Sequence, residues 1–163
     1  MKGEVTMSDR TDDLAKKVEQ ANNYLLRAIE SSTDEQWRAK CADGEWAQGF
    51  AGYHAAASIG GITGMLQGLA QGVKLPPMTM ADVDQQNVGQ LKEHEGCTKQ
   101  EALDMLRTNS PASVQFVRSL SDADLDRKVS LLTEMPEMTI EQVAEMLLVG
   151  HPTGHAQSIT NAR

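Results

Sequence analysis

Three of the four histidines in this 163-residue chain are spaced as metal ligands can be. His151 and His155 are four residues apart, so on a helix their side chains lie one above the other. His54 lies far upstream, in a stretch whose helical face around it is apolar. We expect all three imidazoles to point into the core, where each ring nitrogen needs a partner. One divalent cation would partner all three rings and keep an open position for water or substrate.

The same histidines also have simpler interpretations. A lone inward histidine is usually a hydrogen-bonded core residue, and three of them can bond one another through water. The other reactive side chains are weaker candidates. His94 lies in a charged stretch and is expected at the surface, whereas Cys41 and Cys97 lack adjacent basic residues that would activate a thiolate. We expect both cysteines to be structural.

Helical periodicity dominates the chain and predicts four main helices. Between the second and third helices, residues 78–96 form a long crossover with a short helix over Val83–Glu93. Capping-box patterns mark several helix starts, and Pro111 should kink or break the third helix. The pattern predicts an all-α four-helix bundle with this crossover. The main helices are expected at Asp9–Ser31, Trp46–Gly72, Thr98–Leu120 and Ile140–Ala162.

The second helix is unusually rich in glycine, and each interior glycine costs a helix roughly 1 kcal/mol relative to alanine. Close approach by a neighbouring helix is one explanation for this composition, and room for a ligand or a subunit contact is the other. The glycines that recur four residues apart are Gly60, Gly64, Gly68 and Gly72.

Pro152 lies between the two histidines of the fourth helix. Its ring should clash with the carbonyl of Leu148, and it has no N–H to donate. If the helix only kinks there, both histidines still converge with His54. If a new helix starts at Pro152, His151 leaves that face and the site is lost.

Length and charge narrow the class of protein. We expect residues 1–163 to form one domain, with residues 1–8 flexible. The formal net charge of -8 argues against nucleic acids and anionic membranes as partners. The longest apolar stretch, Phe50–Leu69, contains His54 and several glycines and would make a poor membrane span. With no signal peptide visible and only two cysteines, we expect a cytoplasmic protein.

Several segments resemble the DinB-like superfamily in their order and separation. A tryptophan turn, a Gly-Glu-Trp segment and His54 look like that family's entry into its second helix, and residues 151–155 look like its closing HxxxH. The resemblance spans about Leu14 to Ile159. The segments are Asp34-Glu35-Gln36-Trp37, Asp43-Gly44-Glu45-Trp46, Asp84 to Asn87, Ser119-Leu120-Ser121-Asp122 and His151-Pro152-Thr153-Gly154-His155.

The resemblance implies a four-helix bundle with a zinc or nickel site at His54, His151 and His155. The superfamily includes mycothiol-dependent and bacillithiol-dependent S-transferases and members described as hydrolases. We therefore expect a metal-dependent transferase of a low-molecular-weight thiol to an electrophile, or a hydrolase. Asn87 is a candidate to contact substrate or to support a ligating histidine, and no general base is assignable. The alternative is a non-catalytic metal- or ligand-binding bundle, and a homodimer is also expected.

Overall fold

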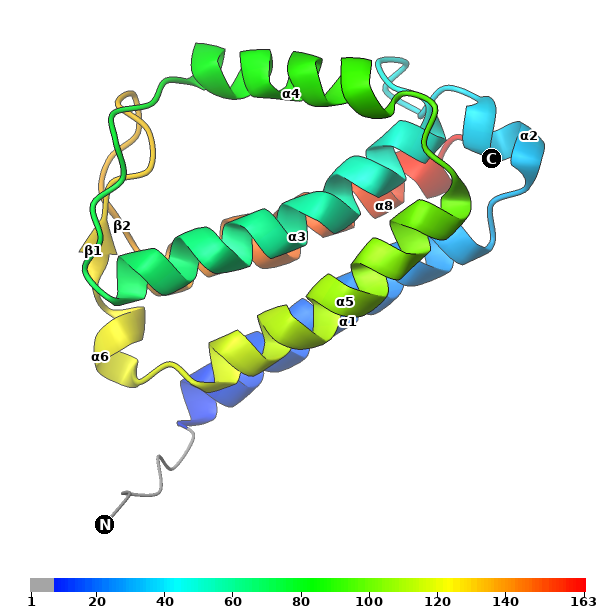
Figure 1. The fold of residues 1–163 in the computed structure, drawn as a ribbon. Coiled ribbons are helices and arrows are strands. Elements are labelled where there is room, and N and C mark those ends of the chain that lie inside the picture. Colours follow the sequence, from blue (N-terminus) through cyan, green and yellow to red (C-terminus); the bar gives the residue numbers. More distant parts are fainter. Residues whose placement is uncertain (1–7) are drawn as a thin grey trace.

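Four long helices dominate the computed structural model, which describes residues 8–163. α1 (Asp9–Glu30) and α3 (Gln48–Ala70) each pack against α5 (Lys99–Arg118) and against α8 (His151–Thr160). α8 completes a composite fourth helix that begins with α7 (Ile140–Ala144) and the π-helical segment η1 (Glu145–Gly150). The four rods enclose one core (Figure 1). The predicted all-α bundle is confirmed, with helix bounds close to those expected.

Capping side chains set most helix starts. Thr33 begins α2 (Asp34–Arg38), Thr98 begins α5 and Thr139 begins α7, each through a reciprocal capping box that the sequence predicts. Two further boxes begin α4 (Met80–His94) and α6 (Asp122–Leu125). The segment 1–8, predicted to be flexible, lies outside the described residues except for Ser8, whose hydroxyl accepts the Thr11 N–H and caps α1.

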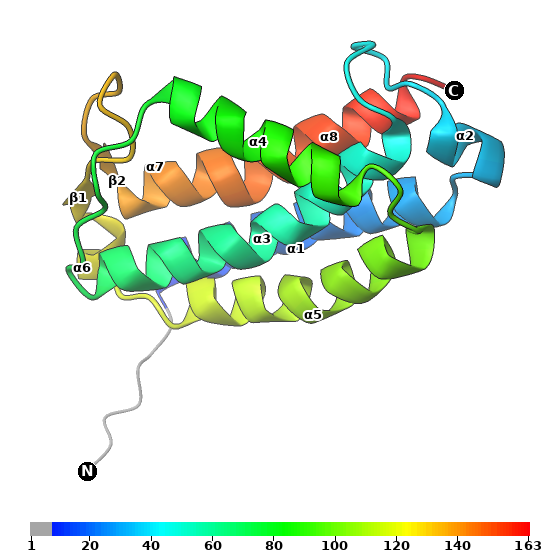
Figure 2. The same ribbon diagram turned by 45° about the horizontal axis from the view of Figure 1, so that its top comes forward.

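The crossover between α3 and α5 carries α4, which is longer than the helix predicted at Val83–Glu93. α4 runs along the outside of the bundle, over α3 and the composite fourth helix (Figure 2). It has no buried residue. Its neighbour at one end of the bundle is a small antiparallel ribbon of β1 (Lys128–Val129) and β2 (Met138–Thr139). α4 is therefore a loosely attached cover and not a core helix.

A proline inside α5 and a glycine after α3 show how these two residue types act in the bundle. α5 runs without a break through Pro111, so of the expected kink or break the break is absent. α3 ends at Ala70, and just beyond it Gly72 has a positive φ of 86°, which lets the Val73 N–H reach back to the Gly68 carbonyl. The core itself is aliphatic. Its largest fully buried apolar side chains are Phe50, Leu14, Leu25, Ile29, Ile59, Leu66, Leu106, Leu125, Ile140, Leu148 and Ile159.

The glycines of α3 fall into two groups. A Cβ at Gly60 would lie 2.8 Å from the side chain of Asn109 on α5, so a close helix approach explains this position. A Cβ at Gly61 or Gly64 would meet nothing within 4 Å. The close-approach explanation is therefore right for Gly60 and wrong for the exposed glycines, which face open space.

This contrast predicts opposite effects of alanine at two positions one turn apart. Gly64→Ala should raise the free energy of unfolding by about 0.5–1 kcal/mol, because alanine restricts the unfolded chain and meets no neighbour. Gly60→Ala should lower it, because the new methyl displaces Asn109 from its hydrogen bond to the Ala56 carbonyl. Urea denaturation of both variants measures the two changes. Shifts of the same sign would contradict this packing.

Among residues 8–163, no helix combines the length and the apolar character that crossing a bilayer requires.

Candidate metal centre

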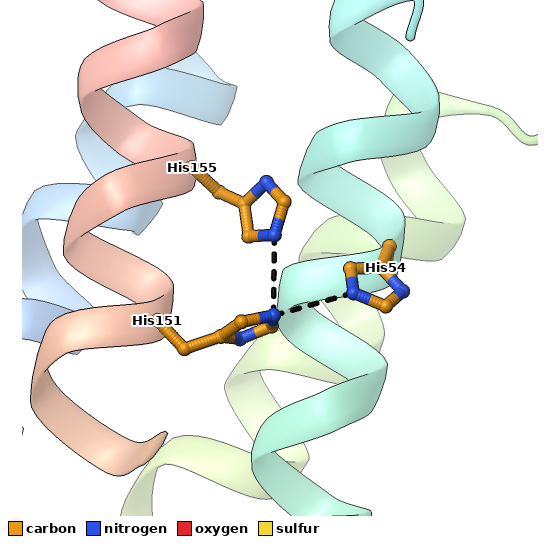
Figure 3. Close-up of side chains that lie close together, drawn as sticks. All are labelled: His54, His151 and His155. Carbon is orange, nitrogen blue, oxygen red and sulfur yellow. Dashed lines mark hydrogen bonds between the residues drawn. The ribbon is translucent and has the colours of Figure 1, made fainter. Parts of the chain in front are cut away.

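α3 and α8 bring three imidazole rings together inside the bundle. His54 projects from α3, and His151 and His155 project from successive turns of α8 (Figure 3). Nε2 of His151 lies 3.3 Å from Nε2 of His54 and 3.2 Å from Nε2 of His155. The ligand nitrogens of the three residues all lie within 4.8 Å of one another. The three predicted ligands therefore converge on one point.

This spacing fits a shared cation. A tetrahedral centre with metal–nitrogen bonds of roughly 2.0–2.1 Å holds its ligand nitrogens about 3.3–3.4 Å apart. The distances from Nε2 of His151 to Nε2 of His155 and of His54 are 3.2 and 3.3 Å, close to that value. Without an ion, the Nε2 atoms have too few hydrogens to bond one another well, because each neutral imidazole carries only one. A donor set of three imidazoles suits zinc, copper, iron and nickel alike.

Gln90 of α4 fixes the ring of His54. Nδ1 of His54 lies 2.6 Å from Oε1 of Gln90. An amide oxygen only accepts, so Nδ1 must carry the hydrogen and donate it. The lone pair of His54 is then on Nε2, which faces the other two histidines. Metal-binding histidines commonly donate their second ring nitrogen in this way.

The structure selects Gln90 where the sequence suggests Asn87. Both side chains lie on the half-buried face of α4, one turn apart, but the hydrogen bond to His54 comes from Gln90. Gln90 therefore supports one histidine of the cluster, and the roles expected of Asn87 stay predictions. Gln90 lies three residues after Asn87 and so shares its helix face, which the sequence alone could have indicated. Nothing in the sequence indicates how far α4 lies from α3.

The two positions can be tested against each other. Gln90→Ala should weaken metal binding by about 10- to 100-fold while the number of metal ions per chain stays unchanged, because the His54 ring loses the acceptor that orients it. Asn87→Ala, on the same face, should change the affinity little. Competition with a chromophoric chelator measures both constants. Equal losses in the two variants would show that α4 acts only as a cover.

The π-helical segment decides where the histidines of the fourth helix point. In a regular α-helix, His151 and His155 would continue the buried stripe of Ile140 and Ala144, as the sequence predicts. In the structure, Pro152, Ala156 and Ile159 are buried instead, and the two histidines are half-buried. A π turn contains one extra residue, which sets the following residues back by about 100° around the axis relative to a regular α-helix. The histidines are thereby turned onto the flank that faces α3.

Pro152 does not carry His151 away from the other two histidines. The His151 N–H donates to the Met146 carbonyl, five residues back, so the backbone ladder is already widened where the proline enters. Pro152 lies in the first turn of α8, where its missing N–H costs least. Of the two outcomes considered for this proline, convergence of the histidines is the one found.

An aromatic wall covers the histidines on one side. The Trp46 ring stacks on His155, with centroids 5.7 Å apart and planes 6° from parallel. The same ring meets His54 edge-on at 5.0 Å and Phe50 at 4.8 Å. The loop before α3 is fixed to α8 because the Ser158 hydroxyl donates to Asp43 and the Ala42 N–H donates to the Ser158 carbonyl. Trp46 is therefore held against the site by contacts with the helix that carries His155.

Burial keeps the three imidazoles neutral. Desolvation, together with the nearby His155 and His54, lowers the pKa of His151 to about 3. Desolvation and His54 lower the pKa of His155 to about 4, although the carboxylate of Asp43 opposes the shift. Burial also lowers the pKa of His54, with its hydrogen bond to Gln90 opposing. Neutral rings at physiological pH have their lone pairs free for a cation.

The remaining reactive groups lie apart from this cluster. Burial raises the pKa of Cys41 and raises that of Cys97 to about 11, so neither thiol ionises readily. Both cysteines are unpaired. His94 is not the free surface residue that the sequence predicts, because it is half-buried and its ring lies 4.6 Å from that of Tyr53. It serves to attach the end of α4 to α3.

The fold and the site together define an all-helical bundle protein with a three-histidine cluster that could bind a metal ion. The sequence profile of the DinB superfamily matches residues 17–159. The chain therefore belongs to the DinB superfamily. A search of curated proteins and a search of solved structures found no match.

Proposed function

We propose that this protein binds one divalent metal ion, zinc or nickel, through His54, His151 and His155, and uses it to transfer a low-molecular-weight thiol to an electrophile. The observation that carries the proposal is the convergence of three neutral imidazole nitrogens from two helices at separations that suit a tetrahedral ion. Membership of the DinB superfamily supports it, since three-histidine sites are expected there.

A divalent ion held by three imidazoles would lower the pKa of a thiol or water in its open position, making it a nucleophile near neutral pH. The chain's own part is to hold the imidazoles neutral, to orient His54 through Gln90 and to shield one side with Trp46 and Phe50. In the reaction, the thiol proton leaves to water, the sulfur lone pair forms the new bond to the electrophilic carbon, and the leaving group departs with its bonding electrons.

Thiol transfer is favoured over hydrolysis by the lack of a base beside the site. Among residues 8–163, no carboxylate hydrogen-bonds any of the three Nε2 atoms. A thiol with a pKa near 8.5 loses its proton far more easily than water, whose pKa is about 15.7, and so needs less help from a base. Hydrolysis is the second candidate activity.

A non-catalytic metal- or ligand-binding bundle is the alternative in another class of function, and the lack of an acid or base favours it too. Rings that bond one another through water, without a metal, form the third possibility. Metal analysis of protein purified without chelator separates this possibility from the other two. One ion per chain supports the proposed centre, and protein that stays metal-free after incubation with zinc and nickel rules it out.

Turnover is tested with chelated and reloaded protein, a set of low-molecular-weight thiols and a chromogenic electrophile. We expect thiol consumption only after reloading with metal, and its loss in His54→Ala. If reloaded protein binds metal but consumes no thiol and hydrolyses no ester or amide substrate, the non-catalytic alternative stands.

Small-molecule thiols and electrophiles are the proposed partners of this protein. Nucleic acids and membranes are not proposed as partners. A cytoplasmic location and a homodimer stay predictions from the sequence. Sedimentation of the purified protein measures its oligomeric state, and fractionation of cells measures its location.

A further inference from the structure

A pocket of about 320 Å³ lies beside the histidine cluster, between the loop that precedes α3, the first turns of α3 and the last turn of α4. Its volume falls at the lower end of the range for small-molecule sites. Its apolar side chains include Trp46, Phe50 and Leu91, and charged side chains include Lys40, Glu45 and Glu95. Such a pocket suits a small molecule with an apolar body and a charged end.

The pocket shares an aromatic wall with the candidate metal centre. Trp46 and Phe50 line the pocket, and the same two rings contact His54, at centroid distances of 5.0 and 6.0 Å. The last turns of α4 also contact both the metal centre and the pocket. Gln90 hydrogen-bonds His54, and the next residue, Leu91, lines the pocket. A molecule in the pocket would therefore press on the rings that pack against the histidines.

The charges around the pocket favour a cation. Neither Glu45 nor Glu95 has an ion-pair partner within 4.0 Å among residues 8–163. The ammonium of Lys40 donates to the backbone carbonyl of Glu45 at 2.9 Å. This hydrogen bond holds the ammonium of Lys40 against the loop before α3. Two unpaired carboxylates that line the same pocket as the partly exposed Trp46 make a setting that attracts an ammonium group by charge.

We propose that this pocket binds the ammonium-bearing part of the substrate, so that the substrate is a small amine with an apolar body next to its charge. The assignment of this ligand as a substrate rests on the proposed function. Binding to the pocket does not, because none of its lining residues is a histidine of the cluster.

Benzylamine is a suitable probe, with benzyl alcohol and benzoate as its neutral and anionic counterparts. Titration into chelated, ¹⁵N-labelled protein should shift the indole N–H resonance of Trp46, assigned with Trp46→Phe. Trp37 provides a reference inside the same spectrum, because its indole donates to the Cys97 carbonyl and does not line the pocket. Benzylamine should bind more tightly than benzyl alcohol, and benzoate should bind least.

Charge variants sharpen the test. Glu45→Gln and Glu95→Gln should each weaken benzylamine binding by about two- to fivefold, as expected for exposed charge pairs. Lys40→Gln is the matched control. It removes a positive charge from the pocket and should strengthen benzylamine binding. Equal affinities for the three probes, or a Trp46 resonance that does not move, would overturn the proposal, as would unchanged affinity in both glutamine variants.

The two proposals fail separately. If the protein binds no metal and benzylamine still shows the expected charge dependence, the pocket assignment stands and the proposed enzyme falls. If metal binds with the expected stoichiometry and the amine does not bind, only the pocket assignment falls.

Discussion

Replacing His151 with alanine should abolish metal binding at concentrations that saturate the unaltered protein. His151 is the central ring of the cluster, since its Nε2 lies within 3.3 Å of both other Nε2 atoms. The variant would retain only the nitrogens of His54 and His155. We expect the affinity to fall by more than about 100-fold, which exceeds the usual effect of removing a supporting residue. Metal content after dialysis and isothermal titration give the two measurements.

His94→Ala is the matched control, because it removes a partly buried histidine that contacts Tyr53 and no member of the cluster. It should keep one metal ion per chain. Metal should also raise the melting temperature of His94→Ala and leave that of His151→Ala unchanged, because a ligand stabilises only the folded state that binds it. If His151→Ala still binds one ion with similar affinity, the metal lies elsewhere.

Chelated protein should lose stability steeply as the pH falls from about 6.5 to 4. The pKa of His151 is about 3 in the folded chain and near 6.5 when unfolded, so in this interval the unfolded state binds more protons. The free energy of unfolding therefore falls with decreasing pH and is fully recovered above pH 6.5. His151 alone should contribute a loss on the order of 3 kcal/mol by pH 4. Urea denaturation at pH 7 and pH 4 measures it.

His151→Leu is the comparison for this experiment, because leucine fills the site and cannot take a proton. The pH-dependent loss should be smaller in this variant than in the unaltered chain. Carboxylates with lowered pKa values, such as Asp124 and Asp126, affect both proteins alike and lose their contributions at lower pH. Metal-loaded protein should keep its stability to lower pH than chelated protein, since bound metal holds the imidazoles unprotonated. Identical pH profiles for the two chelated proteins would contradict a buried neutral His151.

Much of the fold is readable from the sequence because local rules govern it. The stripe from Leu14 to Ile29 on α1 and the capping boxes at Thr98 and Thr139 each depend on residues within a few positions of one another. Such signals need no knowledge of the neighbours. Pro111 shows the limit of these rules, because they allow a break there that the packed helix does not have.

The candidate site was only partly predictable for the same reason. Hydrophobic periodicity and family resemblance together select His54, His151 and His155. Periodicity alone explains the inward direction of His151 and His155 wrongly. It places them on the buried face of the fourth helix, which Pro152, Ala156 and Ile159 occupy in the structure. The π turn that separates the two sets depends on the backbone ladder and has no distinctive residue pattern.

Gln90 illustrates a second limit. Its contact with His54 joins an outer helix without buried residues to the centre of the bundle. The position of α4 depends on a few contacts at its ends and on the lengths of the loops around it. Sequence patterns indicate that the helix exists, but they do not indicate which of its polar side chains reaches inward.

The π turn at Glu145–Gly150 has a consequence for how this stretch tolerates change over evolutionary time. An ordinary helix accepts many substitutions and few gaps, because a gap rotates everything that follows. Here, removing one residue would restore a regular ladder while leaving α8 in its present orientation. A substitution that restored the ladder without shortening the chain would instead swing α8 by about 100°. Relatives that lack one residue before the HxxxH pattern can therefore present the same histidines.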